Sequence, residues 1–400
     1  MSDDQFFTRA VHAGQPTAKG GSRPIAPSID PAVTYTYERM DDLSAALHEN
    51  AGYSYQRYAS PTVAALEAAV AALEGAEEAI AYSTGMAALH AVFASLAITP
   101  ERPLLAAWDM YGATRGLLNQ LYGSSAAPLV HFVEMTDRDA VKTAIERCSP
   151  RAVFLESISN PLLKVADLPQ IAAWSHAAGA SVIVDATFAT PYVLQPLNQG
   201  ADIVVHSATK YLGGHGDVMG GVIATSADRA RTLRQQIRLF GANLGPFEAW
   251  LVLRGIRTLA LRMREQCANA LQVAQWLLEQ PAIAKAIYPG LPDHADHATA
   301  ARLFRADCFG GVVAFELRNA DESTVFRFME ALKLVQTGTS LGDVYSLLLY
   351  PAQSSHHGLG REERLRRGIG DGLVRLSCGI EAAHDIIADL TQALSVVRNK

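Results

Sequence analysis

The sequence predicts an α/β protein with a buried parallel sheet, followed by a smaller α+β domain. The first observation is length, because 400 residues exceed one small module and indicate several domains or one large unit with an appendage. The second is composition, because 49% hydrophobic and 18% charged residues supply a large core and exclude intrinsic disorder. The third is pattern, because short apolar runs alternate with helical stretches, as they do in βαβ units.

The N-terminal part reads as an extended arm over residues 1–58. It is rich in Pro, Gly and Ser, for example in the segment Gly-Gly-Ser-Arg-Pro at 20–24, and it shows little periodicity. A helix follows it. Pro61 suits the first helical position, Val63, Leu66, Val70 and Leu73 recur at helical spacing, and Gly75 suits the end.

The next segment, 59–255, is expected to form the large domain. Its helical stretches include Gly85–Leu96 and Leu168–Ala178. Its apolar runs, which we expect to be buried parallel strands, are Ala79–Ser83, Leu104–Trp108, Leu129–Val133, Ala152–Leu155, Val182–Val184 and Ile203–Val205.

The last segment, 256–400, is expected to form an α+β domain. A helical region from Phe247 to Leu278 breaks near Gly255, which places the border. A mixed charged run, Arg361 to Arg367, indicates a solvated face or loop. The expected strands are Val312–Leu317 and Val374–Ser377, and the expected helices are Glu322–Leu332 and Ala383–Val396.

Charge and cysteine usage exclude several classes of protein. The 34 basic and 40 acidic residues give a net charge of −6, which argues against a nucleic-acid scaffold. The four cysteines are far apart and lack CxxC spacing, which argues against a disulfide framework or a zinc site. The N-terminus does not read as a signal peptide, and no uniformly apolar run reaches the ~18 residues of a membrane span. We therefore expect a cytoplasmic protein without membrane or nucleic-acid partners.

Polar residues follow two of the expected strands. Asp185 ends the run 182–184, and Ser207, Thr209 and Lys210 follow the run 203–205. Because ligands bind at the carboxyl ends of strands in open parallel sheets, these groups should meet in one crevice. A lysine forms a Schiff base with a carbonyl cofactor, an aspartate keeps a pyridinium nitrogen protonated, and hydroxyls suit phosphate. The set fits pyridoxal phosphate, with an ordinary structural Lys–Asp pair as the alternative.

A second polar cluster, Ser83-Thr84-Gly85-Met86, ends a strand and opens a helix. Backbone N–H groups at a helix N-terminus bind phosphate, and Gly85 permits close approach. Simple N-capping by Ser83 or Thr84 is the alternative.

The run from Ser207 to Asp217, Ser-Ala-Thr-Lys-Tyr-Leu-Gly-Gly-His-Gly-Asp, resembles the cofactor-lysine signature of the trans-sulfuration enzymes. This Cys/Met-metabolism family of fold-type-I pyridoxal-phosphate enzymes includes cystathionine γ-synthase, cystathionine γ- and β-lyases, methionine γ-lyase and O-acylhomoserine sulfhydrylases. Further motifs match in family order across nearly the whole chain: Tyr55–Thr62, Ser83–Met86, Tyr111-Gly112, Glu156–Pro161, Leu253–Gly255, Tyr288–Gly290 and Val374–Ser377.

The resemblance implies a mostly parallel seven-stranded sheet with flanking helices, and pyridoxal 5′-phosphate as the cofactor. Lys210 would carry the cofactor covalently and move protons, and Asp185 would pair with its pyridine nitrogen. The phosphate would be bound by Gly85, Met86, Ser207 and Thr209. In this family a neighbouring subunit completes the phosphate site, and Tyr55 and Arg57 match those positions, which implies a homotetramer of two catalytic dimers.

Substrate residues follow from the same resemblance. Tyr111 would stack on the cofactor ring and act near the leaving group, and Asn160 would lie near the 3′-oxygen of the cofactor. Arg375 would bind the substrate carboxylate, for which the guanidinium fork is suited. Ser340 would help to place Lys210 or the substrate, and Thr339 precedes it.

Several positions depart from the common family pattern, and two of them separate the chain from a standard methionine γ-lyase. Ala186 stands where an asparagine usually follows the aspartate in the family. Ala113 stands where those lyases carry a reactive cysteine, and Ile237 falls near a lysine that they use.

The pocket for the distal end of the substrate also departs from the family pattern. Thr339 replaces a glutamate usual in cystathionine-handling enzymes, and Tyr345 and Leu349 fall where acidic residues are common. A less acidic pocket follows. Arg115 either adds a positive charge near the leaving group or is a helix-surface arginine.

The expected reaction is γ-elimination on a sulfur amino acid similar to cystathionine, methionine or homocysteine, with γ-replacement on an O-acylhomoserine as the alternative. The motif order argues against an aminotransferase, and Lys210 with Arg375 argues against a non-catalytic role. No metal is expected, because the histidines of Asp293–His297 and His356-His357 read as surface loop residues. Cys378 reads as a buried structural thiol.

Overall fold

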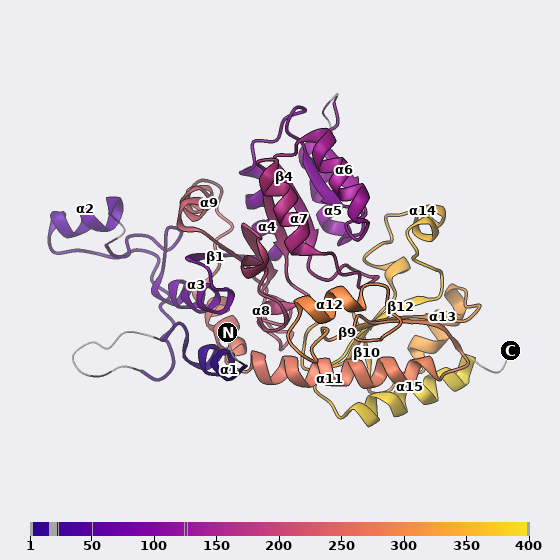
Figure 1. Cartoon of the computed structure of the whole chain (residues 1–400). Coiled ribbons are helices and arrows are strands. Elements are labelled where there is room, and N and C mark those ends of the chain that lie inside the picture. The colour runs from indigo at the N-terminus through magenta and orange to yellow at the C-terminus, as the bar shows by residue number, and fades with distance from the viewer. Residues whose placement is uncertain are drawn as a thin grey trace. The chain divides into compact units, whose positions relative to one another are not determined.

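The computed structural model describes residues 3–15, 22, 24–49, 51–123, 125 and 127–397. The chain divides into two compact units, one formed by Met1–Leu96 with Asp202–Leu259 and the other by Ala97–Ala201 with Ala260–Lys400. Each unit is therefore built from two separate stretches of sequence, which can be followed by colour in Figure 1.

The first unit carries an antiparallel set of three strands. Strand β7 lies between β1 and β6, so that Tyr82 and Ser207 both face Gly221 in the ladder. Its elements are α1 (Asp3–His12), α2 (Met40–His48), α3 (Pro61–Glu74), β1 (Glu78–Tyr82), α4 (Gly85–Ala94), β6 (Ile203–Ser207), β7 (Gly221–Thr225), α9 (Ala227–Phe240) and α10 (Pro246–Ile256).

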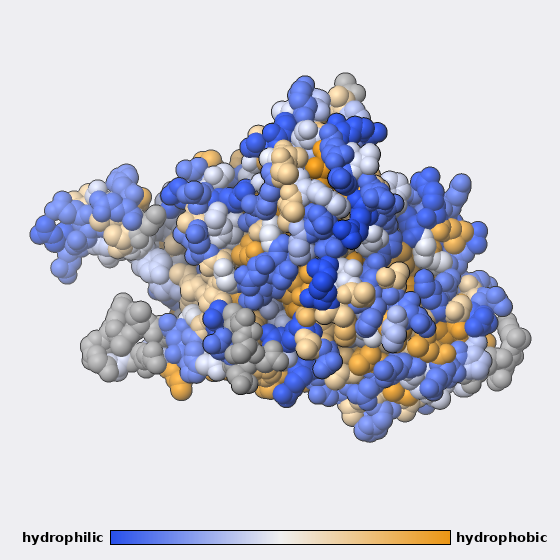
Figure 2. Space-filling view, in the orientation of Figure 1, coloured by the Kyte–Doolittle hydropathy of each residue, from blue (hydrophilic) through white to orange (hydrophobic). Residues whose placement is uncertain are grey.

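Helix α3 has the local signals that the sequence predicts. The Ser60 hydroxyl accepts a hydrogen bond from the Val63 N–H, Pro61 occupies the first turn, and Gly75 ends the helix at φ 72°. The apolar face of α3 packs on β1 and α10. In Figure 2, hydrophilic side chains cover the more peripheral helix α2.

The second unit contains four parallel strands in the order β5-β4-β2-β3. Every residue of β2 and β4 is buried, as expected for strands covered on both faces. Helix α6 packs on β3 and α7 on β5. The elements of this part are β2 (Leu104–Ala107), α5 (Gly112–Tyr122), β3 (Val130–Val133), α6 (Arg138–Cys148), β4 (Ala152–Glu156), α7 (Leu168–Ala177), β5 (Ser181–Asp185), α8 (Thr190–Val193) and the 3-10 helix η1 (Pro196–Gln199).

The same unit has a five-stranded sheet in the order β10-β11-β12-β9-β8, antiparallel except for the β10–β11 pair. Its elements are α11 (Leu259–Leu278), β8 (Ile283–Ile287), α12 (His297–Leu303), β9 (Val312–Leu317), α13 (Glu322–Glu330), β10 (Gln336–Thr337), β11 (Leu347–Leu349), η2 (Pro351–Gln353), α14 (Arg361–Arg366), β12 (Leu373–Ser377) and α15 (Ala383–Val397).

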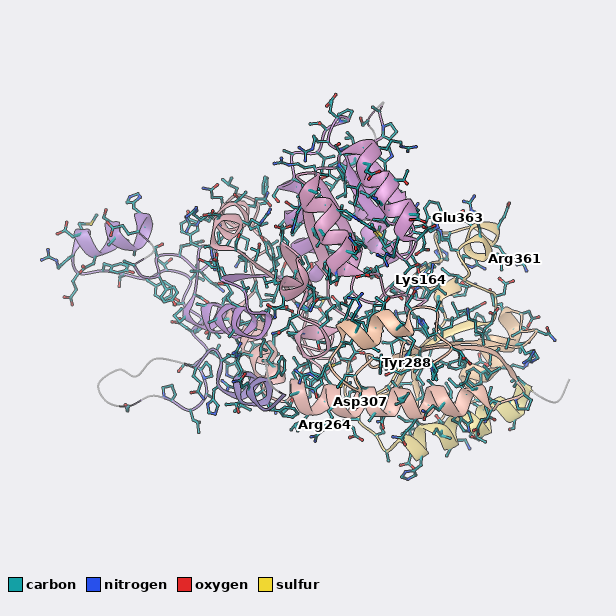
Figure 3. All side chains as sticks on the ribbon, in the orientation of Figure 1. Lys164, Arg264, Tyr288, Asp307, Arg361 and Glu363 are labelled. Carbon is teal, nitrogen blue, oxygen red and sulfur yellow. The ribbon has the colours of Figure 1, made fainter. Side chains whose placement is uncertain are left out.

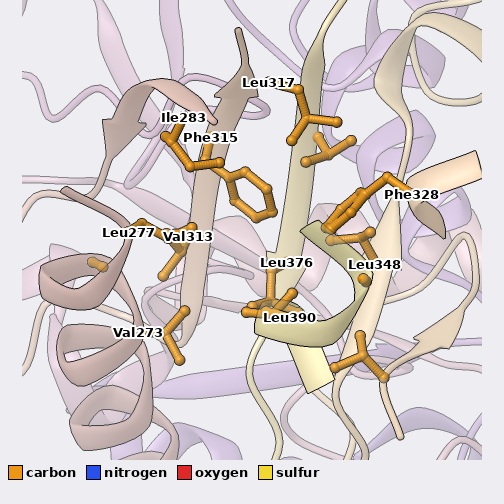
Figure 4. Close-up of a cluster of buried hydrophobic side chains, with 14 of the residues drawn as sticks. Val273, Leu277, Ile283, Val313, Phe315, Leu317, Phe328, Leu348, Leu376 and Leu390 are labelled. Carbon is orange, nitrogen blue, oxygen red and sulfur yellow. The ribbon is translucent and has the colours of Figure 1, made fainter. Parts of the chain in front are cut away.

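One face of this sheet forms a continuous apolar core with three helices. Figure 4 shows Leu277 of α11, Phe328 of α13 and Leu390 of α15 converging on Phe315 and Leu376 of the sheet. Burying a side chain of this size contributes about 1.5–3 kcal/mol. The opposite face carries Arg375, because neighbouring residues of a strand point to opposite faces.

The predicted α/β fold with a mostly parallel sheet is confirmed, and the helix break near Gly255 falls between α10 and α11. Strand β7 was not predicted, nor was its antiparallel pairing with β1 and β6. The predicted arm is not extended throughout, because α1 and α2 are helices; its residues 1, 2, 16–21, 23 and 50 lie outside the described part. The three-domain borders, 1–58, 59–255 and 256–400, stay a prediction.

The charged run Arg361–Arg367 forms α14 and the residue after it, and not only a solvated face. Figure 3 marks Arg361 and Glu363 on this helix. The Arg367 side chain is buried over the Trp108 ring, 4.7 Å from its centroid. Among the described residues, no helix combines the length and hydropathy required to cross a membrane.

Candidate active site

The lysine expected to carry the cofactor follows β6 in the first unit. Ser207 is the last residue of this strand, and its carbonyl accepts the Lys210 N–H at 3.1 Å. The Lys210 carbonyl in turn accepts the Gly214 N–H at 2.8 Å. This turn fixes the lysine three positions beyond the strand, half-buried, as the sequence predicts.

The N-terminus of α4 lies against the same strand end. The Thr84 hydroxyl caps α4 by accepting the Ala87 N–H at 3.0 Å, which confirms the capping interpretation. A Cβ on Gly85 would lie 3.0 Å from the Ser207 Cβ, so a side chain here would fill the space beside the serine. Helix N-terminal amides and a hydroxyl thus converge, an arrangement that fits a phosphate group. Met86 is the second residue of this helix.

Thr209 joins the lysine turn to β7. Its hydroxyl accepts the Gly220 N–H at 3.0 Å, and the Gly220 carbonyl lies 3.3 Å from both the hydroxyl and the N–H of Thr209. The Thr209 hydroxyl therefore orders the loop between Lys210 and β7. Its role as a phosphate ligand stays a prediction.

The two residues expected to serve a neighbouring subunit form an aromatic–cation cluster. The Arg57 guanidinium lies 5.3 Å from the ring centroid of Tyr58 and 5.5 Å from that of Tyr55. Arg57 also donates a hydrogen bond to the Arg238 carbonyl at the end of α9. The Arg238 guanidinium lies 5.2 Å from the Tyr58 ring centroid, so Tyr58 contacts both arginines. These contacts restrict the orientation of Arg57 within its own chain.

The aspartate and the substrate residues lie in the second unit. Asp185 ends β5, where its Oδ1 accepts the Thr187 N–H at 2.9 Å. In the parallel ladder Asp185 is opposite Glu156 of β4, and its carbonyl accepts the Ser157 N–H at 2.9 Å. Two carboxylates thus stand at neighbouring strand ends. The predicted crevice that joins Asp185 to Lys210 stays a prediction.

Glu156 has contacts that sequence reasoning missed. Its Oε1 accepts the Tyr111 N–H at 2.7 Å and its Oε2 accepts the Asn160 N–H at 3.0 Å. Burial, followed by the charges of Asp185 and Asp109, raises the pKa of Glu156 well above its ordinary value. The signal in the sequence was a single acidic residue directly after the apolar run 152–155.

Arg375 of β12 is buried and holds two neutral oxygen atoms. Its Nη1 donates to the Asn160 Oδ1 at 2.9 Å and its Nη2 to the Ser340 carbonyl at 3.2 Å. Its guanidinium carbon lies 5.8 Å from the ring centroid of Phe188. Both of these oxygen atoms are neutral, and the forked donors of a guanidinium suit a carboxylate. Ser340 therefore contacts Arg375 through its main chain.

A cavity of about 410 Å³ lies beside the segment that contains Thr339. It is lined mainly by apolar side chains, among them Leu349, and its acidic lining residue is Glu330. Leu349 is paired with Arg375 across the β11–β12 ladder, so both side chains point to the same face of the sheet. Tyr345 is half-exposed. The less acidic pocket for the distal end of the substrate stays a prediction.

Tyr111 and Arg115 differ in their surroundings. Tyr111 precedes α5 and is 40% exposed, so its ring remains accessible. Arg115 is half-buried over two rings, with its guanidinium carbon 4.0 Å from the Phe132 centroid and 5.1 Å from the Trp108 centroid. Burial and the nearby Arg367 lower the pKa of Arg115. Arg115 thus packs on aromatic rings and is not a purely exposed helix residue. Its position near the leaving group stays a prediction.

A group of charged and polar side chains surrounds the loop that follows β4. Lys164, marked in Figure 3, is paired with Glu134 at 2.5 Å and lies 3.8 Å from Asp109. Asp109 also accepts the Ser159 hydroxyl at 2.9 Å. Burial raises the pKa of Asp109 to about 6, with Lys164 and Ser159 opposing the shift. This cluster anchors the loop that leads from β4 to Asn160.

The expectation of a surface His356 is wrong. The side chain is buried, its Nδ1 lies 2.9 Å from the Ser355 hydroxyl, and burial together with Arg375 and Arg367 lowers its pKa to about 4. Within the described ranges, no group of three or more His, Cys, Asp or Glu side chains is arranged for a metal ion. Cys378 is buried as expected, and burial raises its thiol pKa.

The sequence of residues 7–395 matches the family model described as Cys/Met metabolism PLP-dependent enzyme. The chain belongs to this family. It is 41% identical over 388 residues to cystathionine beta-lyase of Lactococcus lactis subsp. cremoris, covering 97% of this chain and 98% of that protein. It is 39% identical to L-methionine gamma-lyase of Pseudomonas putida (97% of each chain) and 38% identical to O-succinylhomoserine sulfhydrylase of Pseudomonas aeruginosa (98% and 96%).

Solved structures agree with this assignment. Cystathionine gamma-lyase from Lactobacillus plantarum, complexed with L-serine, aligns with a TM-score of 0.89 at 34% identity, covering 98% of this chain and 99% of that chain. Cystathionine gamma synthase from Xanthomonas oryzae pv. oryzae, in complex with cystathionine, aligns with a TM-score of 0.90 at 35% identity, covering 98% of each. The predicted family, fold type, enzymatic nature and pyridoxal-phosphate cofactor are confirmed.

Proposed function

We propose that this enzyme catalyses γ-elimination on a sulfur-containing amino acid and releases a 2-oxo acid, ammonia and a thiol. The single observation that carries the proposal is the Arg375 guanidinium, buried and held by two neutral oxygen atoms, which suits the α-carboxylate of an amino acid. Relatives named cystathionine lyase and methionine gamma-lyase support the reaction type.

Separate residues carry substrate binding and proton transfer in this proposal. Arg375 binds the substrate carboxylate and, through Asn160, its position is fixed relative to the end of β4. Lys210 accepts the α-proton and then removes a proton from the β-carbon. The bond between the γ-carbon and sulfur breaks, and the sulfur takes up a proton and leaves as a thiol. Water then displaces the nitrogen, which gives the 2-oxo acid and ammonia. Tyr111 covers the ring and acts near the leaving sulfur.

Bound pyridoxal phosphate supplies the electron sink for these proton transfers. The Asp185 carboxylate holds a proton on the pyridine nitrogen. Gly85, Met86, Ser207 and Thr209 hold the phosphate, and the space beside Ser207 that a Gly85 Cβ would fill supports this assignment.

Tyr55 and Arg57 complete the phosphate site of a neighbouring subunit, so the active form is a homotetramer of two catalytic dimers. The restricted Arg57 guanidinium supports this role. Light scattering tests it, because a fully active monomer contradicts the assignment. Three of the free cysteines are buried, which agrees with a cytoplasmic location.

The alternative is γ-replacement on an O-acylhomoserine, favoured by the O-succinylhomoserine sulfhydrylase relative. Purified enzyme is incubated with L-cystathionine, L-methionine, L-homocysteine or O-succinyl-homoserine, with and without a thiol. Release of 2-oxobutanoate from a thioether without added thiol establishes γ-elimination. Release only from the ester, suppressed by thiol as a thioether forms, establishes replacement. Pyruvate from cystathionine instead establishes β-elimination and refutes both.

A further inference from the structure

We infer that Glu156 is a positioning residue for this reaction, because its one carboxylate holds both Tyr111 and Asn160 in place. Asn160 in turn contacts Arg375, so Glu156 acts on the substrate carboxylate through two intermediates. The inference rests on the roles proposed above for Tyr111, Asn160 and Arg375. Nothing in the family match or in the names of the relatives assigns Glu156 a function.

The geometry gives each carboxylate oxygen one main-chain partner. Oε1 lies 2.7 Å from the Tyr111 nitrogen, and Oε2 lies 3.0 Å from the Asn160 nitrogen. Tyr111 directly precedes α5, and Asn160 belongs to the loop after β4. The two segments are 45 and 4 residues from Glu156 in sequence. Glu156 thus joins the main chain of these two segments, which the hydrogen bond between Ser159 and Asp109 also connects.

The contact continues from the main chain of Asn160 to its side chain. The Asn160 Oδ1 accepts a hydrogen bond from the Arg375 Nη1 at 2.9 Å, and the other terminal nitrogen of Arg375 donates to the Ser340 carbonyl. A shift of the Asn160 backbone therefore weakens a hydrogen bond that orients the guanidinium.

A carboxyl group fits this position in a way that an amide does not. Both main-chain partners are N–H donors, one on each oxygen, and these two bonds favour the ionised carboxylate against the rise in pKa that burial causes. A glutamine side chain offers one acceptor oxygen and one NH₂ donor. Glu156→Gln therefore sets the NH₂ group against either the Tyr111 or the Asn160 N–H. Burial beside Asp185 and Asp109 is unfavourable for a charged side chain.

The test compares Glu156→Gln with Asp389→Asn. Asp389 is a matched control, because it is a buried carboxylate in the same unit that accepts the N–H groups of Lys333, Leu334 and Val335 and has no contact with a proposed site residue. We expect KM for the amino acid to rise about tenfold in Glu156→Gln, the loss of roughly one hydrogen bond. We also expect the visible circular dichroism of the bound cofactor to change, because Tyr111 shifts. Asp389→Asn should lower the melting temperature and leave both readouts unchanged.

A double-mutant cycle separates positioning from general damage. If Glu156 acts through Asn160, KM of Glu156→Gln/Asn160→Ala should be no higher than that of Asn160→Ala alone. Additive effects overturn the inference. If Glu156→Gln does not fold, Glu156→Asp replaces it, because the shorter side chain cannot reach both N–H groups.

The outcomes also distinguish this inference from the proposed function. If the wild-type enzyme turns over none of the amino acids tested, the proposed function fails. If the wild type is active and Glu156→Gln matches Asp389→Asn in KM and circular dichroism, only the positioning role fails.

Discussion

Replacing Arg375 by lysine should weaken substrate binding through the loss of a forked contact. The guanidinium donates through Nη1 to Asn160 and through Nη2 to Ser340, which leaves its plane fixed for a carboxylate. A lysine ammonium is a compact point charge on a shorter side chain, and it cannot reproduce the paired, planar hydrogen bonds of the guanidinium. A hydrogen bond between charged groups contributes about 1.5–3 kcal/mol, so KM should rise about 10- to 150-fold while kcat changes less.

The assay is steady-state release of the 2-oxo acid from the best amino-acid substrate and from its methyl ester. The ester lacks the negative charge, so the wild-type enzyme should discriminate against it strongly and Arg375→Lys only weakly. Arg302→Lys is the matched control, because Arg302 forms a partly exposed ion pair with Asp167 and has no role in the site. If Arg375→Lys discriminates against the ester as strongly as the wild type, the carboxylate assignment is refuted.

Four further results are expected. Lys210→Ala should abolish turnover and the visible absorbance of covalently held cofactor, and retention of both after dialysis contradicts its role. Gly85→Ala places a Cβ in the space beside the end of β6. It should weaken cofactor binding about tenfold in a fluorescence titration, and an unchanged affinity refutes the assignment of Gly85 to the phosphate site. Glu74→Ala removes the buried carboxylate that lies 2.5 Å from His206. The free energy of unfolding in urea should fall by about 3–5 kcal/mol. A loss below about 1 kcal/mol shows that the pair is dispensable. The pKa of buried His356 is lowered from 6.5 to about 4, so the unfolded chain binds the proton first. His356 alone should therefore remove about 3 kcal/mol of stability as pH falls from 6.5 to 4, while Asp109, with its pKa raised to about 6, acts in the opposite direction. Compared with the wild type, His356→Gln should lose less stability over this range in melting curves, and an identical pH dependence contradicts the neutral, buried state of His356.

Local signals in the sequence were sufficient for the elements they define. Helix α3 was predicted with its first and last turns, because Pro61 and Gly75 act within a few residues of its ends, and the structure adds Ser60 as the N-cap. The same holds for β9, an apolar run at 312–317 that only Glu316 interrupts. The turn that carries Lys210 could also be placed, because it follows directly from a strand end.

The missed features depend on contacts between distant residues. Strand β7 follows a glycine-dense stretch, and its pairing with both β1 and β6 has no local signal. Glu156 contacts Tyr111 across 45 residues, which no periodicity reveals. His356 lies in a loop, yet it is buried beside Arg375 and Arg367. The candidate site residues could therefore be predicted from polar residue types in the sequence. The residues that orient them could be found only in the tertiary structure.

The glycines around the lysine turn have a consequence for protein engineering. A Cβ on Gly221 would lie 2.3 Å from the Thr84 carbonyl oxygen, and one on Gly255 would lie 2.1 Å from the Gly213 carbonyl oxygen. The backbone of Gly221 thus packs directly against that of Thr84, and the backbone of Gly255 against that of Gly213. A mutagenesis library that seeks a new substrate range should hold these glycines constant, since any side chain there displaces the backbone. Diversity is better directed to Thr339 and Tyr345, which the sequence predicts in the pocket for the distal end of the substrate and which lie outside the turn.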